Sequence, residues 1–323
     1  MILQRSIVAR SVPVLFRIFL LICAALPVSC TFHSESNVES GRRDQILHFG
    51  NGDEPQEIDP HVVTGIPEWH IIMALYEGIV SKHPRDLSIQ PGVAESWTVS
   101  DDQTVYTFKI RRNAKWSNGD RITAHDFVYS WRRALMPAVG NLYAYMFYYI
   151  RNAEAFFTGK ISDFNQVGVR AVDDLTLQVE LVAPTPFFLQ LLDHHSFYPV
   201  HPGTIEKFGA IDERGTRWTR PGNFVGNGPF KLKEWTLNRI LVVEKNPMYW
   251  DADRVKLREI HFYPIPNTST EERMYRAGQL HVTDKVPTDK IAVYRENDPG
   301  SLNISPYLGT YFYRFNTTKA PLS

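Results

Sequence analysis

The sequence predicts an α/β protein in which mixed β-sheets are flanked by helices. Tyr106, Phe108 and Ile110 recur at every second position, which places them on one face of a strand. Residues 175–181 alternate in the same way. Across residues 271–294, segments with helical and strand patterns follow one another, and such alternation is typical of the α/β class.

The segment 91–137 carries the strongest local signals of the chain. Its strand lies between two polar turns at residues 100–102 and 116–120. A helix then begins at Thr123, because Asp126 stands three residues later and completes a capping box. The apolar residues of this helix share one face, and they are Phe127, Val128, Trp131 and Leu135. Pro137 ends the helix. We expect Trp97, Trp116 and Trp131 to pack in the core of this segment rather than to contact a ligand.

Further elements follow from periodicity and from turn residues. The predicted strands are 45–49, 231–235, 240–244, 280–283 and 306–313, of which the second and third form a hairpin. The predicted helices are 68–80, 151–160, 187–192, 204–208, 271–278 and 288–294. Gly226 and Gly228 flank Asn227, which indicates either a positive φ or close packing of the backbone.

The composition is that of an ordinary globular protein. The chain has 323 residues, of which 43% are hydrophobic and 22% are charged, so it is long enough for two cores of usual size. Lys and Arg together number 35, and so do Asp and Glu. This balance gives no general positive field, and we expect no nucleic acid or anionic membrane surface as a partner.

The amino terminus is typical of an export signal. Residues 1–30 contain three arginines and no acid, and the apolar run 18–26 is too short to cross a hydrocarbon core of about 30 Å. Cys30 ends Leu-Pro-Val-Ser-Cys, which resembles a lipobox except at Pro27. We expect lipidation at Cys30, or cleavage without a lipid, and then a tether over residues 31–44; a buried helix is the alternative. Both cysteines lie in this segment, so the mature domain cannot form an internal disulfide.

A series of motifs occurs in a characteristic order. They are N-G-x-E-x-x-x-x-D-P at 51–60, A-E-S-W at 94–97, Y-T-F at 106–108, K-W-S-N-G-D at 115–120, T-A-x-D-F-V-Y-S-W-R-R at 123–133, G-N-G-P-F at 226–230 and K-N-P-x-Y-W at 245–250. In them the chain resembles the extracytoplasmic peptide-binding proteins of bacterial ABC importers, the oligopeptide- and dipeptide-binding family. The resemblance extends over residues 45–323.

The resemblance implies a periplasmic-binding-protein-like receptor of type II, cluster C, with two lobes. Its first α/β lobe would be discontinuous, and a small α+β domain would be inserted into it. The implied parts are the first lobe at 45–76 and 201–305, the inserted domain at 77–200, and the start of a second lobe at 306–323. Family members continue for roughly two hundred further residues, so we expect a truncated second lobe.

The sequence contains no pattern that predicts catalysis or a cofactor. G-x-S-x-G, H-E-x-x-H, C-x-x-C and a P-loop are all absent, which argues against an enzyme and against ATP binding by this chain. Asp193, His194, His195 and His201 form the best metal candidate, but adjacent residues point in different directions. We interpret these as ordinary surface or interface histidines. The acidic pairs at 101–102 and 173–174 belong to turns.

The resemblance also implies which residues contact a ligand. Thr64, Gly65 and Ile66 correspond to an extended segment that flanks the ligand backbone, and Tyr143 corresponds to a tyrosine of the inserted domain that reaches the peptide. Tyr275 and Tyr307 border the same cleft or are buried in the lobe core. Main-chain pairing of this kind tolerates many ligand sequences.

The expected function is capture of oligopeptides by a monomeric periplasmic receptor, which delivers them to an ABC permease with its ATPase subunits. The lobes would close by a hinge when ligand binds. Three alternatives stay open: a relative that binds dipeptides, murein peptides, haem, nickel chelates or sugars; a non-transporting truncated interaction module; and an exported hydrolase, which the missing motifs disfavour.

Overall fold

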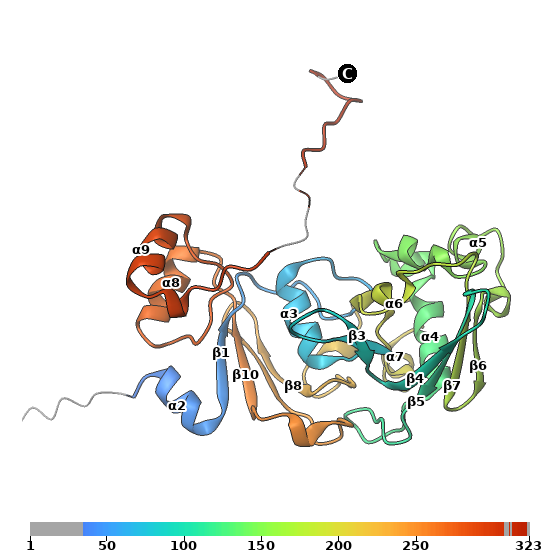
Figure 1. Cartoon of the computed structure of the whole chain (residues 1–323), viewed down its shortest axis with the longest axis horizontal. Helices are drawn as coiled ribbons and strands as arrows, with labels where there is room; N and C mark the ends of the chain where they lie inside the picture. The colour runs from blue at the N-terminus through green and yellow to red at the C-terminus, as the bar shows by residue number, and fades with distance from the viewer. Residues whose placement is uncertain (1–34, 307–309, 311, 322–323) are drawn as a thin grey trace, which may run out of the picture. The chain divides into compact units, whose positions relative to one another are not determined.

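The structure is a computed structural model that describes residues 35–306, 310 and 312–321 (Figure 1). The expected export signal and Cys30 lie outside the described residues. Contacts divide the chain into Met1–Glu35 and Ser36–Ser323, and the following concerns the second unit. In the part of the chain that is described, no helix combines the length and hydropathy needed to cross a bilayer.

The first sheet contains four strands in the order β1-β10-β9-β8 (Figure 1). β1 (Ile46–Gly50) runs parallel to β10 (Glu259–Tyr263), and their register places His48 beside His261. β9 (Ile240–Lys245) pairs antiparallel with β10 and with β8 (Phe230–Thr236). The predicted hairpin is therefore confirmed.

Helices of moderate length accompany this sheet. They are α2 (Asn37–Asp44), α3 (Ile66–Leu75), α7 (Pro202–Phe208), α8 (Thr268–Arg276) and α9 (Ile291–Asn297). One hydrophobic core joins α3 to the sheet, and its buried residues lie within 58–76 and 198–262. Ile71, Ile72 and Leu75 of α3 are fully buried in it.

The second sheet is entirely antiparallel, in the order β4-β5-β7-β6. Its strands are β4 (Ala94–Val99), β5 (Val105–Ile110), β7 (Thr176–Glu180) and β6 (Val169–Asp173), and a separate hairpin joins β2 (Val80–Lys82) to β3 (Ile89–Pro91). Its helices are α4 (Ala124–Ala134), α5 (Ala153–Phe157) and α6 (Phe188–Leu191). The buried residues of this second core lie within 79–197, and they include Tyr106, Phe108 and Ile110 as predicted.

The remaining helical segments are single 3₁₀ turns or short runs of them. They are Pro137–Val139, Ala144–Tyr149, Phe164–Gln166, His195–Phe197, Arg217–Thr219, Ala252–Arg254, Thr288–Lys290 and Pro299–Ser301. The predicted helix at 288–294 is thus split between a 3₁₀ turn and α9.

Helix α4 confirms the predicted cap. The Thr123 N–H donates to Asp126 Oδ2 over 2.8 Å. Phe127 and Trp131 have no exposed surface, and the Trp131 Nε1–H donates to the Phe197 carbonyl over 2.9 Å. The aromatic stripe of this helix therefore organises the second core, with Trp131 fixed by a hydrogen bond as well as by packing.

The Gly-Asn-Gly motif lies where the chain passes between the two cores. The Gly228 N–H donates to the Leu75 carbonyl over 2.9 Å. A Cβ on either glycine would overlap backbone atoms of Leu75 or Tyr76. Neither glycine has a positive φ, so the close-packing alternative is the correct one. The motif lets its backbone bond directly to that of Leu75.

Asn227 completes this junction by imitating a strand partner. Its Oδ1 accepts from the Glu77 N–H over 3.1 Å, and its Nδ2 donates to the Glu77 carbonyl over 2.9 Å. Asn227 is 2% exposed. The chain leaves the first core at Glu77, and the side chain of Asn227 consequently holds the backbone of this residue in place.

Two predicted elements differ at the ends of the described chain. The expected tether over 31–44 is wrong for residues 37–44, which form α2. Ser36 and Glu39 build a capping box there, and Gly41 packs on the rings of His48 and His281. The expected strand 306–313 falls partly outside the described residues, and its described positions are not in a strand.

Two further predicted elements are shorter in the structure. The predicted strand at 280–283 is reduced to a parallel bridge between Phe49 and Val282. The helix predicted over 68–80 ends at Leu75. Beyond it, Glu77 is held by Asn227, and Val80 begins β2. Apolar residues at helical spacing do not reveal such competition in advance.

Candidate functional site

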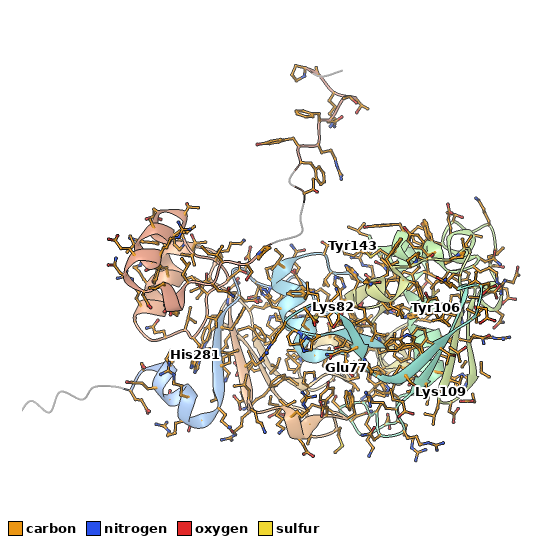
Figure 2. All side chains as sticks on the ribbon, viewed as in Figure 1. Glu77, Lys82, Tyr106, Lys109, Tyr143 and His281 are labelled. Atoms are coloured by element: carbon orange, nitrogen blue, oxygen red, sulfur yellow. The ribbon has the colours of Figure 1, made fainter. Side chains whose placement is uncertain are left out.

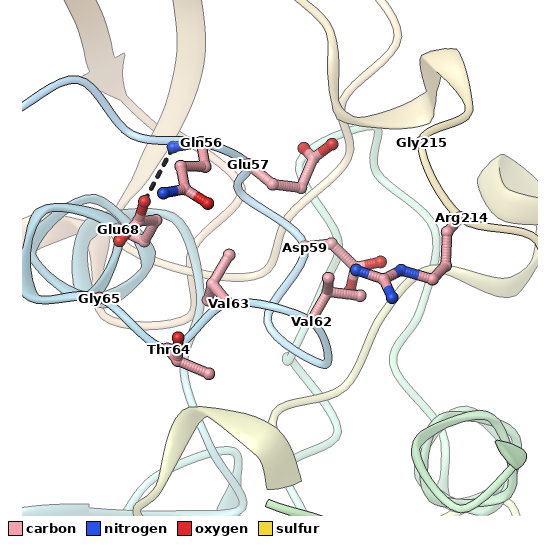
Figure 3. A pocket seen from close by; sticks show the side chains of 10 residues that line it. All are labelled: Gln56, Glu57, Asp59, Val62, Val63, Thr64, Gly65, Glu68, Arg214 and Gly215. Carbon is pink, nitrogen blue, oxygen red and sulfur yellow. Dashed lines mark hydrogen bonds between the residues drawn. The ribbon is translucent and has the colours of Figure 1, made fainter. Parts of the chain in front are cut away.

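A pocket of about 420 Å³ adjoins two of the predicted ligand-contacting residues (Figure 3). Its lining comes from the segment before α3, from the first turn of α3 and from a loop after α7: Gln56, Glu57, Asp59, Val62, Val63, Thr64, Gly65, Glu68, Arg214 and Gly215. Thr64 is exposed, and Ile66, the third residue predicted in this segment, is 52% exposed. The segment therefore offers both a backbone and an open depression beside it.

A buried ion pair positions this segment. Arg133 of α4 places its Nη2 2.6 Å from Asp59 Oδ2 and its Nη1 3.0 Å from Asp59 Oδ1. Burial by itself raises the pKa of Asp59. The Arg133 guanidinium lowers it by more, so the pKa of Asp59 is lowered overall. The carboxylate therefore stays charged, and the pair ties the first core to the second.

His61 extends the same contact. Its Nδ1 lies 2.9 Å from Arg133 Nη1, a donor, so Nδ1 accepts and the proton resides on Nε2, which donates to the Tyr198 carbonyl over 3.0 Å. Burial, assisted by the Arg133 charge, lowers the pKa of His61 to about 3. The imidazole is thus neutral at physiological pH and links Arg133 to the Tyr198 carbonyl by hydrogen bonds.

Gly65 leaves room for the carboxylate of Glu68. A Cβ at Gly65 would overlap Glu68 Oε2. Glu68 Oε1 accepts from the Gln56 N–H over 2.8 Å, across the start of α3. The carboxylate thereby compensates the positive end of the helix and closes the loop that carries Thr64.

Tyr143, labelled in Figure 2, packs against two histidines, one of which is hydrogen-bonded to the segment before α3. Its ring centroid lies 4.5 Å from that of His194 and 5.6 Å from that of His195. His195 Nδ1 lies 2.7 Å from the Pro60 carbonyl, to which it donates. Burial raises the pKa of Tyr143, so the phenol is a neutral hydrogen-bonding group.

The structure does not bring the other predicted residues to the same place. Tyr275 lines a separate pocket of about 570 Å³ with Tyr294 and His281, among others. Ile66 lines a third pocket of about 300 Å³, shared with Ile265 and Lys285. Tyr307 lies outside the described residues. Thr64 and Gly65 thus line one pocket, and Ile66 and Tyr275 line two others.

The histidines considered as metal ligands have structural partners. His194 and His201 accept backbone N–H groups at the starts of their own short helices, and His195 is only 4% exposed. Of the two predicted alternatives, surface or interface, His195 therefore fits the second, because it is buried against the Pro60 carbonyl. Asp193 pairs with Lys82 over 2.7 Å. Within the described ranges, no three His, Cys, Asp or Glu side chains form a group that could hold a metal ion.

The sequence did not single out Glu77, whose carboxylate accepts two short hydrogen bonds (Figure 2). The Tyr249 hydroxyl donates to Oε1 and the Trp250 Nε1–H donates to Oε2, each over 2.6 Å. Burial outweighs these bonds and raises the pKa of Glu77 to about 7. It lines a pocket of about 470 Å³ with Trp69, Met73 and others.

Comparison with known proteins places the chain in a family of solute-binding proteins. A sequence profile of the bacterial extracellular solute-binding proteins, family 5 middle, matches residues 88–323. The periplasmic oligopeptide-binding protein OppA of Salmonella typhimurium is 40% identical over 286 residues, which cover 86% of this chain and 50% of OppA. The periplasmic murein peptide-binding protein MppA of Escherichia coli is 37% identical and is matched over 93% of this chain and 55% of MppA.

A solved structure gives the same result for the fold. Haemophilus influenzae OppA in complex with RPPGFSPFR superposes with a TM-score of 0.81 at 36% identity, covering 86% of this chain and 53% of that one. The predicted fold class is therefore confirmed. The chain spans about half the length of the curated relatives it matches.

Proposed function

The chain belongs to family 5 of the bacterial extracellular solute-binding proteins, and from this premise we propose that it captures oligopeptides and presents them to an ABC permease. The observation that carries the proposal is the 40% identity to an oligopeptide-binding protein across 86% of this chain. Capture and release require no chemical step. The sequence contains none of the common catalytic motifs, which agrees with a binding role.

The proposed ligand segment is Thr64, Gly65 and Ile66, with Tyr143 beside it. Two of these residues line the pocket before α3, and Tyr143 adjoins the Pro60 carbonyl through His195. An extended peptide could pair with this exposed backbone while its side chains enter the depressions alongside. Tyr275 and Tyr307 stay predictions for the same ligand.

The division into parts is also a proposal. Two separate cores, over 79–197 and over 58–76 with 198–262, support an inserted domain at 77–200 within a lobe at 45–76 and 201–305. Export through residues 1–30 would bring the protein to the periplasm. The relatives OppA and MppA are described as periplasmic proteins. Lipidation of Cys30, a monomeric state, and the permease with its ATPase subunits complete the proposal.

A second ligand class has specific support. Relatives at 37% and 35% identity are described as murein peptide-binding and dipeptide-binding proteins. These differ from OppA in the ligand and not in the family. The same site would then take a shorter or a cell-wall-derived peptide.

Thermal melting of the purified protein with a pool of short peptides tests the function. A ligand that binds only the folded state raises the melting temperature once its concentration exceeds the dissociation constant. We expect an upward shift that Tyr143→Ala reduces and Tyr149→Ala, an exposed tyrosine of the same 3₁₀ segment, does not. A cooperative melt without any shift across di-, tri- and longer peptides would refute peptide capture by this chain.

A further inference from the structure

The pocket beside Thr64 contains three carboxylates, and each already accepts a hydrogen bond from within the protein. Glu57, Asp59 and Glu68 accept, respectively, from the Ile58 N–H over 2.9 Å, from the Arg133 guanidinium, and from the Gln56 N–H over 2.8 Å. Asp59 is the most fully engaged, because both of its oxygens face Arg133. None of these carboxylates pairs with the fourth charged group of the pocket.

That fourth group is the guanidinium of Arg214. Figure 3 shows its side chain extending from the loop after α7 toward Val62 and Asp59. Among the described residues it makes no ion pair or hydrogen bond. Its Nη1 lies against Gly140, where φ is +66° and a Cβ would come within 2.8 Å of that nitrogen. Arg214 is therefore the pocket's uncommitted charge, seated over a residue that leaves room for it.

We propose that Arg214 binds a carboxylate of the captured peptide. The inference rests on the proposed function and adds a recognition chemistry to it. A guanidinium presents two parallel N–H donors that match a carboxylate. The pocket, at about 420 Å³, accepts an acidic side chain or the peptide's terminal carboxylate, and Thr64 and Gly65 line it next to the proposed ligand backbone.

The position of the pocket fits an extended ligand. Side chains of an extended peptide point alternately to opposite sides, so a peptide that pairs with the segment ending at Ile66 directs one side chain in two toward the depression. Val62 and Val63 supply apolar contact for the methylene groups of such a side chain. The charged end then meets Arg214, which is exposed and needs little rearrangement.

Four peptides test the proposal by titration: Ala-Glu-Ala and Ala-Gln-Ala, each with a free and with an amidated carboxyl terminus. Because Arg214 is exposed, we expect the favoured carboxylate to improve affinity about three- to tenfold over its amide. Arg214→Gln should abolish that preference and Arg214→Lys should keep part of it. Arg217→Gln, an exposed arginine of the same loop outside the pocket, should leave it unchanged.

The outcomes distinguish a side-chain carboxylate from the terminal carboxylate. They also distinguish a failure of the role of Arg214 from a failure of the peptide-binding function. A preference for Glu over Gln that depends on Arg214 assigns the side chain; a preference for the free terminus that depends on Arg214 assigns the terminal group. Peptides that bind equally well to the wild type and to Arg214→Gln, with the same preferences, overturn the role of Arg214 alone. If none of the peptides binds the wild type while its melt is cooperative, the peptide-binding function fails and this inference with it.

Discussion

The carboxylate of Glu77 should make the stability of this protein fall as the pH rises. Its pKa is raised by burial from an ordinary value of 4.5 to about 7, despite hydrogen bonds from Tyr249 and Trp250. Between these values the folded protein binds a proton that the unfolded chain has released. The group therefore stabilises the fold most below pH 4.5, and this contribution is lost as the pH rises through 7.

The size of the effect follows from the shift. A rise from 4.5 to about 7 corresponds to at most about 3 kcal/mol. Glu77→Gln removes the ionisation and can keep both hydrogen bonds, since its Oε1 accepts from Trp250 and its amide donates to the Tyr249 oxygen. We expect the variant to gain on the wild type as the pH rises, and to be the more stable of the two at pH 8.

Urea unfolding followed by tryptophan fluorescence at pH 5 and at pH 8 measures the difference. Buried histidines oppose the trend, because the pKa of His61 is lowered to about 3 and that of His48 to about 4, so their contribution grows as the pH rises to 6.5. They are common to both proteins and cancel in the comparison. Glu95→Gln, at an exposed glutamate, is the control. An equal stability difference at both pH values would refute the reasoning.

Three further results are expected. Arg133→Met leaves the buried Asp59 carboxylate unpaired and should lower the free energy of unfolding by about 3–5 kcal/mol; adding Asp59→Asn should restore part of it, and a urea midpoint within error of the wild type would contradict the pairing. Gly228→Ala places a Cβ against the backbone of Tyr76 and should cost about 2 kcal/mol or more, measured as a lower melting temperature; an unchanged melt would count against close packing. His48→Gln should reduce the gain in stability from pH 4 to 6.5 by at most about 3 kcal/mol in urea titrations, because burial lowers the pKa of His48 to about 4; an unaltered pH slope would disprove this.

Local patterns predicted most of the elements. The capping box at Thr123 and the alternation around Phe108 depend on residues a few positions apart, and both are confirmed. The turn interpretation of the acidic pairs is likewise confirmed for Asp102 and Asp173, whose carboxylates accept the backbone N–H groups of residues 104 and 175. Such features need no knowledge of the rest of the chain.

The features that failed depend on distant partners. Asp59 and Arg133 each occurred in a motif that the sequence displayed, yet only the fold brings them together across 74 positions. Periodicity over 68–80 predicted one helix, and the pairing of Glu77 with Asn227, 150 positions away, ended it.

The chain enters the second core at Gly78 and leaves it at Tyr198, and these two residues lie side by side. Residues 79–197 are therefore a segment that one protein of this fold can exchange for another. A Cβ on Gly78 would meet the ring of Tyr198, so the chain enters and leaves the second core at neighbouring points. A short turn could reconnect the flanks after excision, as at sites that tolerate domain insertion. Arg133 would leave with this segment and Asp59 would stay behind, uncompensated. A related protein could therefore exchange this part only with a replacement that carries its own cation, or together with a change at Asp59.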